Sequence, residues 1–219
     1  MPRVNALSGE PSPLLTTSED GRTARRERNR NDVVDALLGL YGEGNLDPSS
    51  EQIAERAALS ARSLFRYFDD LGDLARAAIE RQMKRIGDLA QIRTDPSWPL
   101  ALRLQYLVSG RMAFHAAMGP IGQVARIRAP FQPVIAIELN EGRARWRDQF
   151  SVIVAPELAA MTSARAASVS AAADVLLSFE SYQLLRHDQG LASAECIFAL
   201  TATLATLLSE EITCSRCEP

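Results

Sequence analysis

The chain has 219 residues, 47% of them hydrophobic, and a formal net charge of −3 at pH 7. This is enough apolar material for a sizeable core, in one large or two small domains. Residues 1–86 hold 13 basic and 14 acidic side chains and residues 87–219 hold 11 and 13, which excludes a protein that binds nucleic acid through bulk positive charge. Any such affinity must come from local patches.

No apolar run approaches the ~20 residues needed to span a bilayer, and residues 1–30 lack the apolar core of a signal peptide. The three cysteines, an odd number, give no disulfide framework. We therefore expect a cytoplasmic protein with no membrane partner. Cys214 and Cys217 form an isolated CxxC pair, whereas a zinc site needs about four ligands. We expect a frayed terminus there, with a redox pair as the weaker alternative, and neither a metal nor a cofactor.

The amino-terminal segment changes character near residue 22. Residues 1–21 contain Pro2, Pro11 and Pro13 without periodicity, which predicts a flexible arm. Residues 22–30, RTARRERNR, hold five arginines and one glutamate. Such a run can be only the solvated start of a helix. The alternative is contact with a phosphate backbone, for which Arg25 and Arg28 are the candidates.

A first helix is expected over residues 24–42. Its apolar positions recur at helical spacing, and glycines at 42 and 44 end it. The stripe that should face the core consists of Val33, Val34, Leu37, Leu38 and Tyr41.

Residues 49–68, SSEQIAERAALSARSLFRYF, have the pattern of two short helices joined by a tight turn. Ser49 and Gln52 form a capping box for the first helix. Ser60 can cap the second, which we place at 61–68. There Leu64 and Phe68 lie four residues apart and predict the buried face.

Arg62 and Arg66 point away from that face, at roughly 100° of rotation per residue. Arginine can bind the O6 and N7 edge of guanine bidentately or clamp a phosphate. The alternative is a hairpin in an ordinary helical bundle, with both arginines on a solvated face.

The run IAxxAxxSxxxLFRYF resembles the helix-turn-helix of the tetracycline-repressor (TetR) family of bacterial regulators. The resemblance covers roughly residues 25–85, and more weakly the end of the chain. It implies an all-α fold with a DNA-binding head, residues 22–86, and an effector-binding and dimerisation body, residues 87–219. A fourth helix, over about 71–90, links the two and in the family passes the ligand signal to the head. Combined with the reasoning above, the expected DNA contacts are Arg25, Arg28, Ser49, Ser60, Ala61, Arg62, Ser63, Phe65, Arg66 and Tyr67.

Four residues depart from the family pattern. Phe65 stands where a tyrosine is usual, Tyr67 where histidine is common, and Leu71 where a lysine often meets the DNA backbone. The first and third changes remove phosphate contacts, so we expect modest affinity that depends on residues 22–30. Ala58 replaces the usual turn glycine, which costs about 1 kcal/mol if its φ is positive.

Beyond residue 91 the pattern stays helical. We expect helices over 98–118, then to about 128 after a break at Gly119-Pro120, and over 133–154, 163–187 and 191–212. The helix at 163–187 is apolar on two sides and must be covered on both. We therefore expect residues 163–212 to pack against a second copy as a four-helix bundle, with a monomeric bundle as the alternative.

The same body carries aromatic, methionine and histidine side chains that are typical of a core. The family resemblance places an effector pocket here, and a small-molecule site is usually apolar with a few polar groups. His115 is the polar candidate for orienting a ligand, although a histidine satisfied within the core is the plainer interpretation. The expected pocket residues are Met112, His115, Phe131, Trp146, Phe150, Phe179 and Tyr182.

These features predict a dimeric, ligand-responsive transcriptional regulator, most simply a repressor that an unknown small molecule releases from a near-palindromic DNA operator. The alternative is a helical dimer that binds a small molecule or a protein partner and has lost sequence-specific DNA binding. Phe65 and Leu71 favour that alternative. An enzyme is not expected, because no GxSxG, HExxH, P-loop or GxGxxG motif is present.

Overall fold

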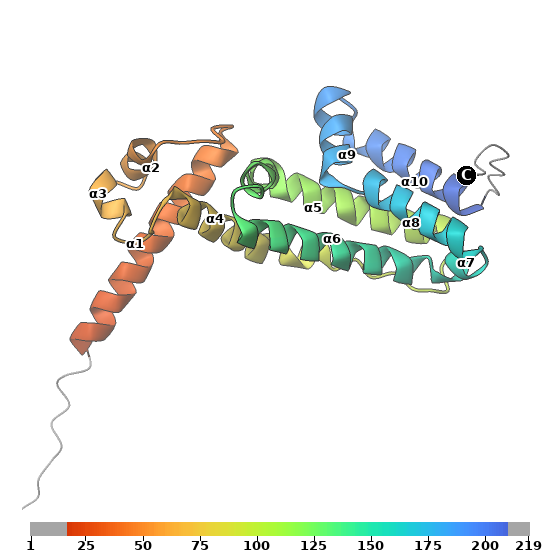
Figure 1. Cartoon of the computed structure of the whole chain (residues 1–219), viewed down its shortest axis with the longest axis horizontal. Coiled ribbons are helices and arrows are strands. Elements are labelled where there is room, and N and C mark those ends of the chain that lie inside the picture. The colour runs from red at the N-terminus through yellow and green to blue at the C-terminus, as the bar shows by residue number, and fades with distance from the viewer. Residues whose placement is uncertain (1–16, 210–219) are drawn as a thin grey trace, which may run out of the picture.

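The computed structural model describes residues 17–209, with side chains from residue 21, and these residues form helices and no strand (Figure 1). The all-α class is therefore confirmed. The first four helices are α1 (Thr17–Gly42), α2 (Ser50–Arg56), α3 (Ala61–Leu64) and α4 (Leu71–Ile86), the last extended by a 3₁₀ turn at Gly87–Ala90. The others are α5 (Leu100–Arg128), α6 (Pro133–Ile153), α7 (Ala155–Ala159), α8 (Ser163–Leu176), α9 (Phe179–Gln183), extended by a π turn at Leu184–Asp188, and α10 (Ser193–Ser209).

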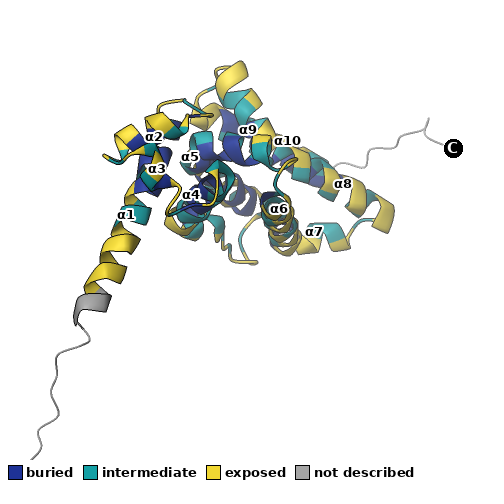
Figure 2. Ribbon diagram, turned by 60° about the vertical axis from the view of Figure 1, so that its left-hand side comes forward, coloured by how far each residue is buried: buried dark blue, intermediate teal, exposed yellow. Residues whose placement is uncertain are grey.

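The apolar faces of α1, α2, α3 and α4 pack together at one end of a hydrophobic core that continues into the later helices. Val33, Val34, Leu37 and Tyr41 of α1 are buried, as their spacing predicts, whereas Leu38 is partly buried. Figure 2 shows this buried stripe continuing into the contact between α1 and the short helices α2 and α3. The buried residues of α2, α3, the connection after α3, and α4 that belong to the same core are Ile53, Ala54, Leu64, Phe68, Leu74, Ala77 and Ala78.

The body is built around α5. This helix contacts α4 and α6 and packs most extensively against α10, and it meets α9 near its carboxyl end, where Arg126 binds Glu180. Gly119 has a φ of 48° and interrupts the helical backbone just before Pro120, so the expected break is present as a kink inside α5. None of the helices formed by residues 17–209 is long and apolar enough to cross a membrane.

Three expected boundaries are wrong. Helix α1 begins at Thr17 rather than at 24, so residues 17–21 belong to a helix and not to an arm. Arginine and alanine are strong helix formers, and no proline interrupts residues 17–30. Residues 1–16, which hold the rest of the expected arm, lie outside the described residues, as do Cys214 and Cys217.

The recognition helix is shorter than expected, because α3 ends at Leu64. The amides of Arg66 and Tyr67 donate to the carbonyls of Ser63 and Leu64, 3.2 and 3.0 Å away, which is the tighter i to i+3 pattern of a helix end. Residues 65–67 therefore form a turn that still delivers Phe68 to the core.

The expected helix at 163–187 is two helices. The amide of Ser178 donates to the carbonyl of Val175, and its side chain accepts from the amide of Ser181 at 3.1 Å. Ser178 is thus the N-cap of α9, which turns away from the direction of α8 (Figure 1). Serine is a favoured N-cap residue, so Ser178 can begin a new helix. This start was missed because the apolar residues before and after Ser178 keep the spacing of one continuous helix.

Candidate DNA-binding surface and ligand cavity

Helix α2 begins at the capping box that the sequence predicts. The Ser49 side chain accepts from the amide of Gln52 at 3.3 Å, and the Gln52 side chain accepts from the amide of Ser49 at 2.8 Å. Two amide groups that a helix start leaves without partners are thereby satisfied. The capping box fixes where α2 begins and leaves Ser49 exposed at the surface.

The turn after α2 is a Schellman motif. The Ala58 amide donates to Glu55 at 3.0 Å and the Leu59 amide donates to Ala54 at 2.9 Å. Ala58 has a φ of 54°, which is the positive value at which an alanine in place of the usual turn glycine costs about 1 kcal/mol. This turn sets the direction in which the chain enters α3.

Helix α3 is anchored by its apolar side and presents its polar side. The Ser60 side chain accepts from the amide of Ser63 at 3.2 Å, while Leu64 and Phe68 are buried in the head core. Arg62 and Arg66 are both exposed, which agrees with the helical geometry derived from the sequence.

The basic stretch of α1 docks beside this element. Asn29 donates through Nδ2 to the Tyr67 hydroxyl at 3.0 Å, and the Arg30 guanidinium lies 4.7 Å from the centroid of the Phe68 ring. Arg25 and Arg28 lie in the turn of α1 just before Asn29 and are exposed. The arrangement adds exposed positive charge next to α3, in a chain whose overall charge is negative.

Helix α4 joins this surface to the body. Its Arg81 donates to Asp35 of α1 at 2.6 Å and to Asn31 at 2.8 Å, and Arg85 also donates to Asp35. At the other end of the same helix, a Cβ on Gly72 would lie 2.2 Å from the side-chain nitrogen of Gln132, which belongs to the connection between α5 and α6. The body therefore packs directly on the start of α4, a few residues after α3.

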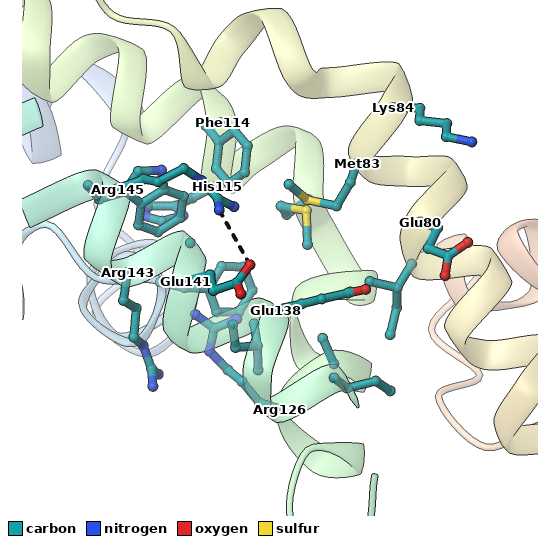
Figure 3. A pocket seen from close by; sticks show the side chains of 18 residues that line it. Glu80, Met83, Lys84, Phe114, His115, Arg126, Glu138, Glu141, Arg143 and Arg145 are labelled. Atoms are coloured by element: carbon teal, nitrogen blue, oxygen red, sulfur yellow. Dashed lines mark ion pairs between the residues drawn. The ribbon is translucent and has the colours of Figure 1, made fainter. Parts of the chain in front are cut away.

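A cavity of about 330 Å³ lies between α4, α5 and α6, with Phe179 of α9 as a further wall. Figure 3 shows the side chains of the three long helices converging on it. Most of its lining is apolar, and the large apolar side chains from α4, α5 and α6 are Ile79, Met83, Phe114, Met118, Ile135 and Trp146. Volume and lining are those of a small-molecule site.

His115 is the most buried polar group of the lining. Its Nε2 lies 2.9 Å from the Leu177 carbonyl, and burial lowers its pKa to about 4, so the ring is neutral and donates from Nε2. Its Nδ1 has no partner within residues 21–209. Edge-on contacts to Phe114, Trp146 and Phe179, whose ring centroids lie 5.2–5.9 Å from that of His115, hold the ring in place.

An ion-pair cluster closes one side of the cavity. Arg126 donates to Glu180 at 2.7 Å and Arg143 donates to the same carboxylate at 2.9 Å. Burial alone would raise the pKa of Glu180, but the hydrogen bond and charge of Arg126, together with the charge of Arg143, lower it to about 2. Arg126 also lies over Phe179, with its guanidinium carbon 4.1 Å from the ring centroid.

Arg111 lies in a separate, much smaller cavity of about 20 Å³, which Phe150 also lines. Its guanidinium stacks on Trp146 at 4.2 Å and donates to Gln149 at 3.1 Å. Burial lowers the pKa of Arg111 to about 10, so it stays charged at neutral pH.

No family model matches the chain. A curated relative, the HTH-type transcriptional repressor KstR of Mycolicibacterium smegmatis, is 34% identical over 74 residues, which are 33% of this chain and 36% of that repressor. The chain therefore matches only about a third of the length of this relative. A TetR-family regulator from Streptomyces coelicolor has the same fold over 83% of this chain and 80% of its own, with a TM-score of 0.65 and 20% identity.

The chain has the TetR-family fold. A transcriptional regulator from Rhodococcus sp. Rha1 shares it over 84% of this chain and 95% of its own, with a TM-score of 0.61 and 14% identity. The resemblance noted from residues 25–85 is confirmed, and the relatives are transcriptional regulators rather than enzymes.

The expected DNA contacts lie on three neighbouring elements, namely the start of α2, α3 with its following turn, and the basic part of α1. The exposed members are Arg25, Arg28, Ser49, Ser60, Arg62, Phe65 and Arg66, while Ala61, Ser63 and Tyr67 are partly buried.

The expected pocket residues separate into two groups. His115, Trp146 and Phe179 line the cavity. Met112 and Tyr182 are buried beside it without lining it, Phe150 lines the smaller cavity, and Phe131 is 83% exposed in the connection between α5 and α6. Aromatic composition alone could not separate these positions, because all of them lie in or next to amphipathic helices.

Sequence reasoning missed the contribution of α4 and the acidic residues of α6. Ile79, Glu80 and Met83 line the cavity from α4, and Glu138 and Glu141 line it from α6. One sequence signal could have identified this part of the wall. Glu138 lies at helical spacing from Ile135 and Leu139, so its carboxylate occupies a position that should face the core.

Proposed function

We propose that this protein is a dimeric, ligand-responsive transcriptional regulator, most simply a repressor, that a small molecule bound in the cavity of about 330 Å³ releases from a near-palindromic operator. In this proposal residues 22–86 bind DNA, and residues 87–219 bind the effector and dimerise.

One observation carries the proposal: a single helix forms both a cavity wall and the support of the DNA-binding surface. Ile79, Glu80 and Met83 of α4 face the cavity, while Arg81 and Arg85 of the same helix bind Asp35 of α1. A ligand that fits the cavity better in one position of α4 than in another would shift the head between two orientations. This is the physical requirement for coupling two sites.

The dimer part of the proposal is supported by apolar residues on the outside of α8 and α10. Val175 is 67% exposed and Phe198 is 76% exposed, although both belong to helices whose other side is core. Small residues beside them permit close packing of two copies in a four-helix arrangement. Two heads related by a two-fold axis would read half-sites about one turn of DNA apart, or a multiple of it.

The test is fluorescence anisotropy with the DNA that flanks the protein's own gene, at two salt concentrations, followed by selection from random DNA if no fragment binds. The Arg62→Ala/Arg66→Ala double variant should lose binding, because it removes the exposed guanidinium groups of α3 and its turn. Arg93→Ala, which removes one exposed arginine of the body, is the charge control and should bind as the wild type does. Each lost phosphate contact should lower the salt slope by about 1.

The alternative, a helical dimer without sequence-specific DNA binding, is favoured by Phe65 and Leu71, which stand where the family pattern has phosphate-contacting side chains. Phe65 is 47% exposed on the candidate surface, where a side chain with a hydroxyl would contact phosphate. If neither genomic DNA nor random DNA yields a preferred fragment, and the double variant behaves as the wild type, this alternative replaces the regulator.

A further inference from the structure

Glu138 is a carboxylate without a partner in the wall of the cavity. It lies on α6 between Ile135 and Leu139, is partly buried, and makes no hydrogen bond or ion pair with any residue of 21–209. Figure 3 shows its side chain extending from α6 toward α4. Burying a charged group without a partner is unfavourable, so its presence in this wall calls for an explanation.

The surroundings of Glu138 make ionisation of its carboxyl group less favourable. Burial raises the pKa of Glu138, and the charge of Glu80 raises it further; Arg76 lowers it by less than Glu80 raises it, and Glu141 adds a small further rise. Glu80 is itself bound by Arg76 at 2.5 Å, and Glu141 lies 3.8 Å from Arg145. Glu138 is therefore the acidic group of the lining that a ligand could neutralise.

The basic groups of the lining are engaged or solvated. Arg126 and Arg143 both bind Glu180, and Arg145 faces Glu141. Lys84 is exposed to solvent at the edge of the cavity, where water screens its charge. A bound anion would therefore find no buried positive group in the lining that lacks a partner.

The aromatic walls suit a cation as well. Trp146 and Phe179 already hold the guanidinium groups of Arg111 and Arg126 over one ring face each, at 4.2 and 4.1 Å. The electron-rich faces of these rings attract positive charge. A metal ion is the wrong kind of cation, since residues 21–209 contain no group of three or more histidine, cysteine or acidic side chains placed to hold one.

We infer that the cavity binds an organic cation, an apolar and mainly aromatic molecule that carries one protonated amine and places it against the carboxylate of Glu138. The inference rests on the proposed function, since it names the chemical class of the effector. The apolar part would lie against Phe114, Met118 and Trp146, and the amine would donate a charge-assisted hydrogen bond to Glu138.

Three naphthalene probes that differ in one group test this directly by isothermal titration calorimetry. They are 1-naphthylmethylamine, 1-naphthalenemethanol and 1-naphthoate, which are cationic, neutral and anionic at pH 7. For the wild-type protein we expect the amine to bind about tenfold more tightly than the alcohol, and the acid more weakly than either. Glu138→Gln should remove the advantage of the amine and leave the affinity for the alcohol unchanged.

Asp148→Asn is the matched control, because Asp148 is an exposed carboxylate of the same helix that does not line the cavity. It should change the affinity for the amine by less than about threefold, as expected for a solvated charge. An unchanged affinity of Glu138→Gln for the alcohol also shows that the cavity of the variant is intact.

The outcomes distinguish a failure of the cation inference from a failure of the proposed function. If the alcohol binds at least as tightly as the amine, or if Glu138→Gln retains the advantage of the amine, the cation inference is wrong while a ligand-binding cavity stands. If none of the probes binds, both the inference and the ligand-responsive part of the proposed function fail. DNA binding is then still decided by the anisotropy experiment on its own.

Discussion

Replacing Ala58 by glycine should stabilise the protein, although glycine normally weakens a fold. Ala58 occupies the C′ position of the Schellman motif that ends α2, with a φ of 54°. An L-residue pays about 1–2 kcal/mol for the left-handed conformation. Glycine avoids this strain but loses about 0.4–1 kcal/mol more backbone entropy on folding. The Ala58 side chain is exposed, so no packing is lost.

The difference predicts that Ala58→Gly gains about 0.5–1 kcal/mol in the free energy of unfolding. For a chain of this size that corresponds to a rise of about 1–4 °C in Tm. Urea denaturation followed by far-UV circular dichroism measures the free energy, and a thermal scan measures the Tm.

Ala113→Gly supplies the matched control, since Ala113 is an exposed alanine inside α5. There the substitution should cost about 1 kcal/mol, because glycine is a poor helix former. The reasoning is refuted if Ala58→Gly lowers the stability as Ala113→Gly does, since the strain attributed to the turn would then be absent.

Three further predictions concern the cavity wall. Glu138→Gln should raise the Tm of the ligand-free protein at pH 7, because a folded-state pKa above the usual value makes the ionised carboxylate destabilising; the gain should vanish below about pH 4, where glutamate is protonated in both states. Gly122→Ala should cost about 1–3 kcal/mol in urea denaturation and weaken binding of 1-naphthalenemethanol, because the new Cβ would lie 2.5 Å from the Phe179 ring. Because burial lowers the pKa of His115 to about 4, the unfolded chain binds a proton on this histidine between pH 6.5 and 4 while the folded protein does not, so the free energy of unfolding should fall by up to about 3 kcal/mol as the pH drops through that window. His115→Phe should remove this part of the pH dependence. An equal dependence of stability on pH in both proteins would contradict the burial assigned to His115.

The amino-acid sequence by itself determined the local architecture of the head. The capping box of Ser49 and Gln52, the Ser60 cap, and the burial of Leu64 and Phe68 all depend on residues three or four positions apart. Interactions between residues so close in sequence can be predicted from the residue order alone, and the helical spacing of apolar residues predicts the all-α class in the same way. The possible strain at Ala58 could be stated in advance for the same reason.

Only the tertiary structure decided the length of α3, the new start at Ser178 and the composition of the cavity. Asn29 and Arg30 of α1 contact Tyr67 and Phe68, where the chain has already left the helix, and no local pattern records this contact. The cavity wall depends on which faces of α4, α5, α6 and α9 meet. Phe131 and Phe179 are both phenylalanines of the expected pocket, yet Phe131 is exposed to solvent whereas Phe179 is buried and lines the cavity. Whether Glu138 finds a partner is likewise a matter of distances between helices, because charges separated in sequence interact only where folding brings them together.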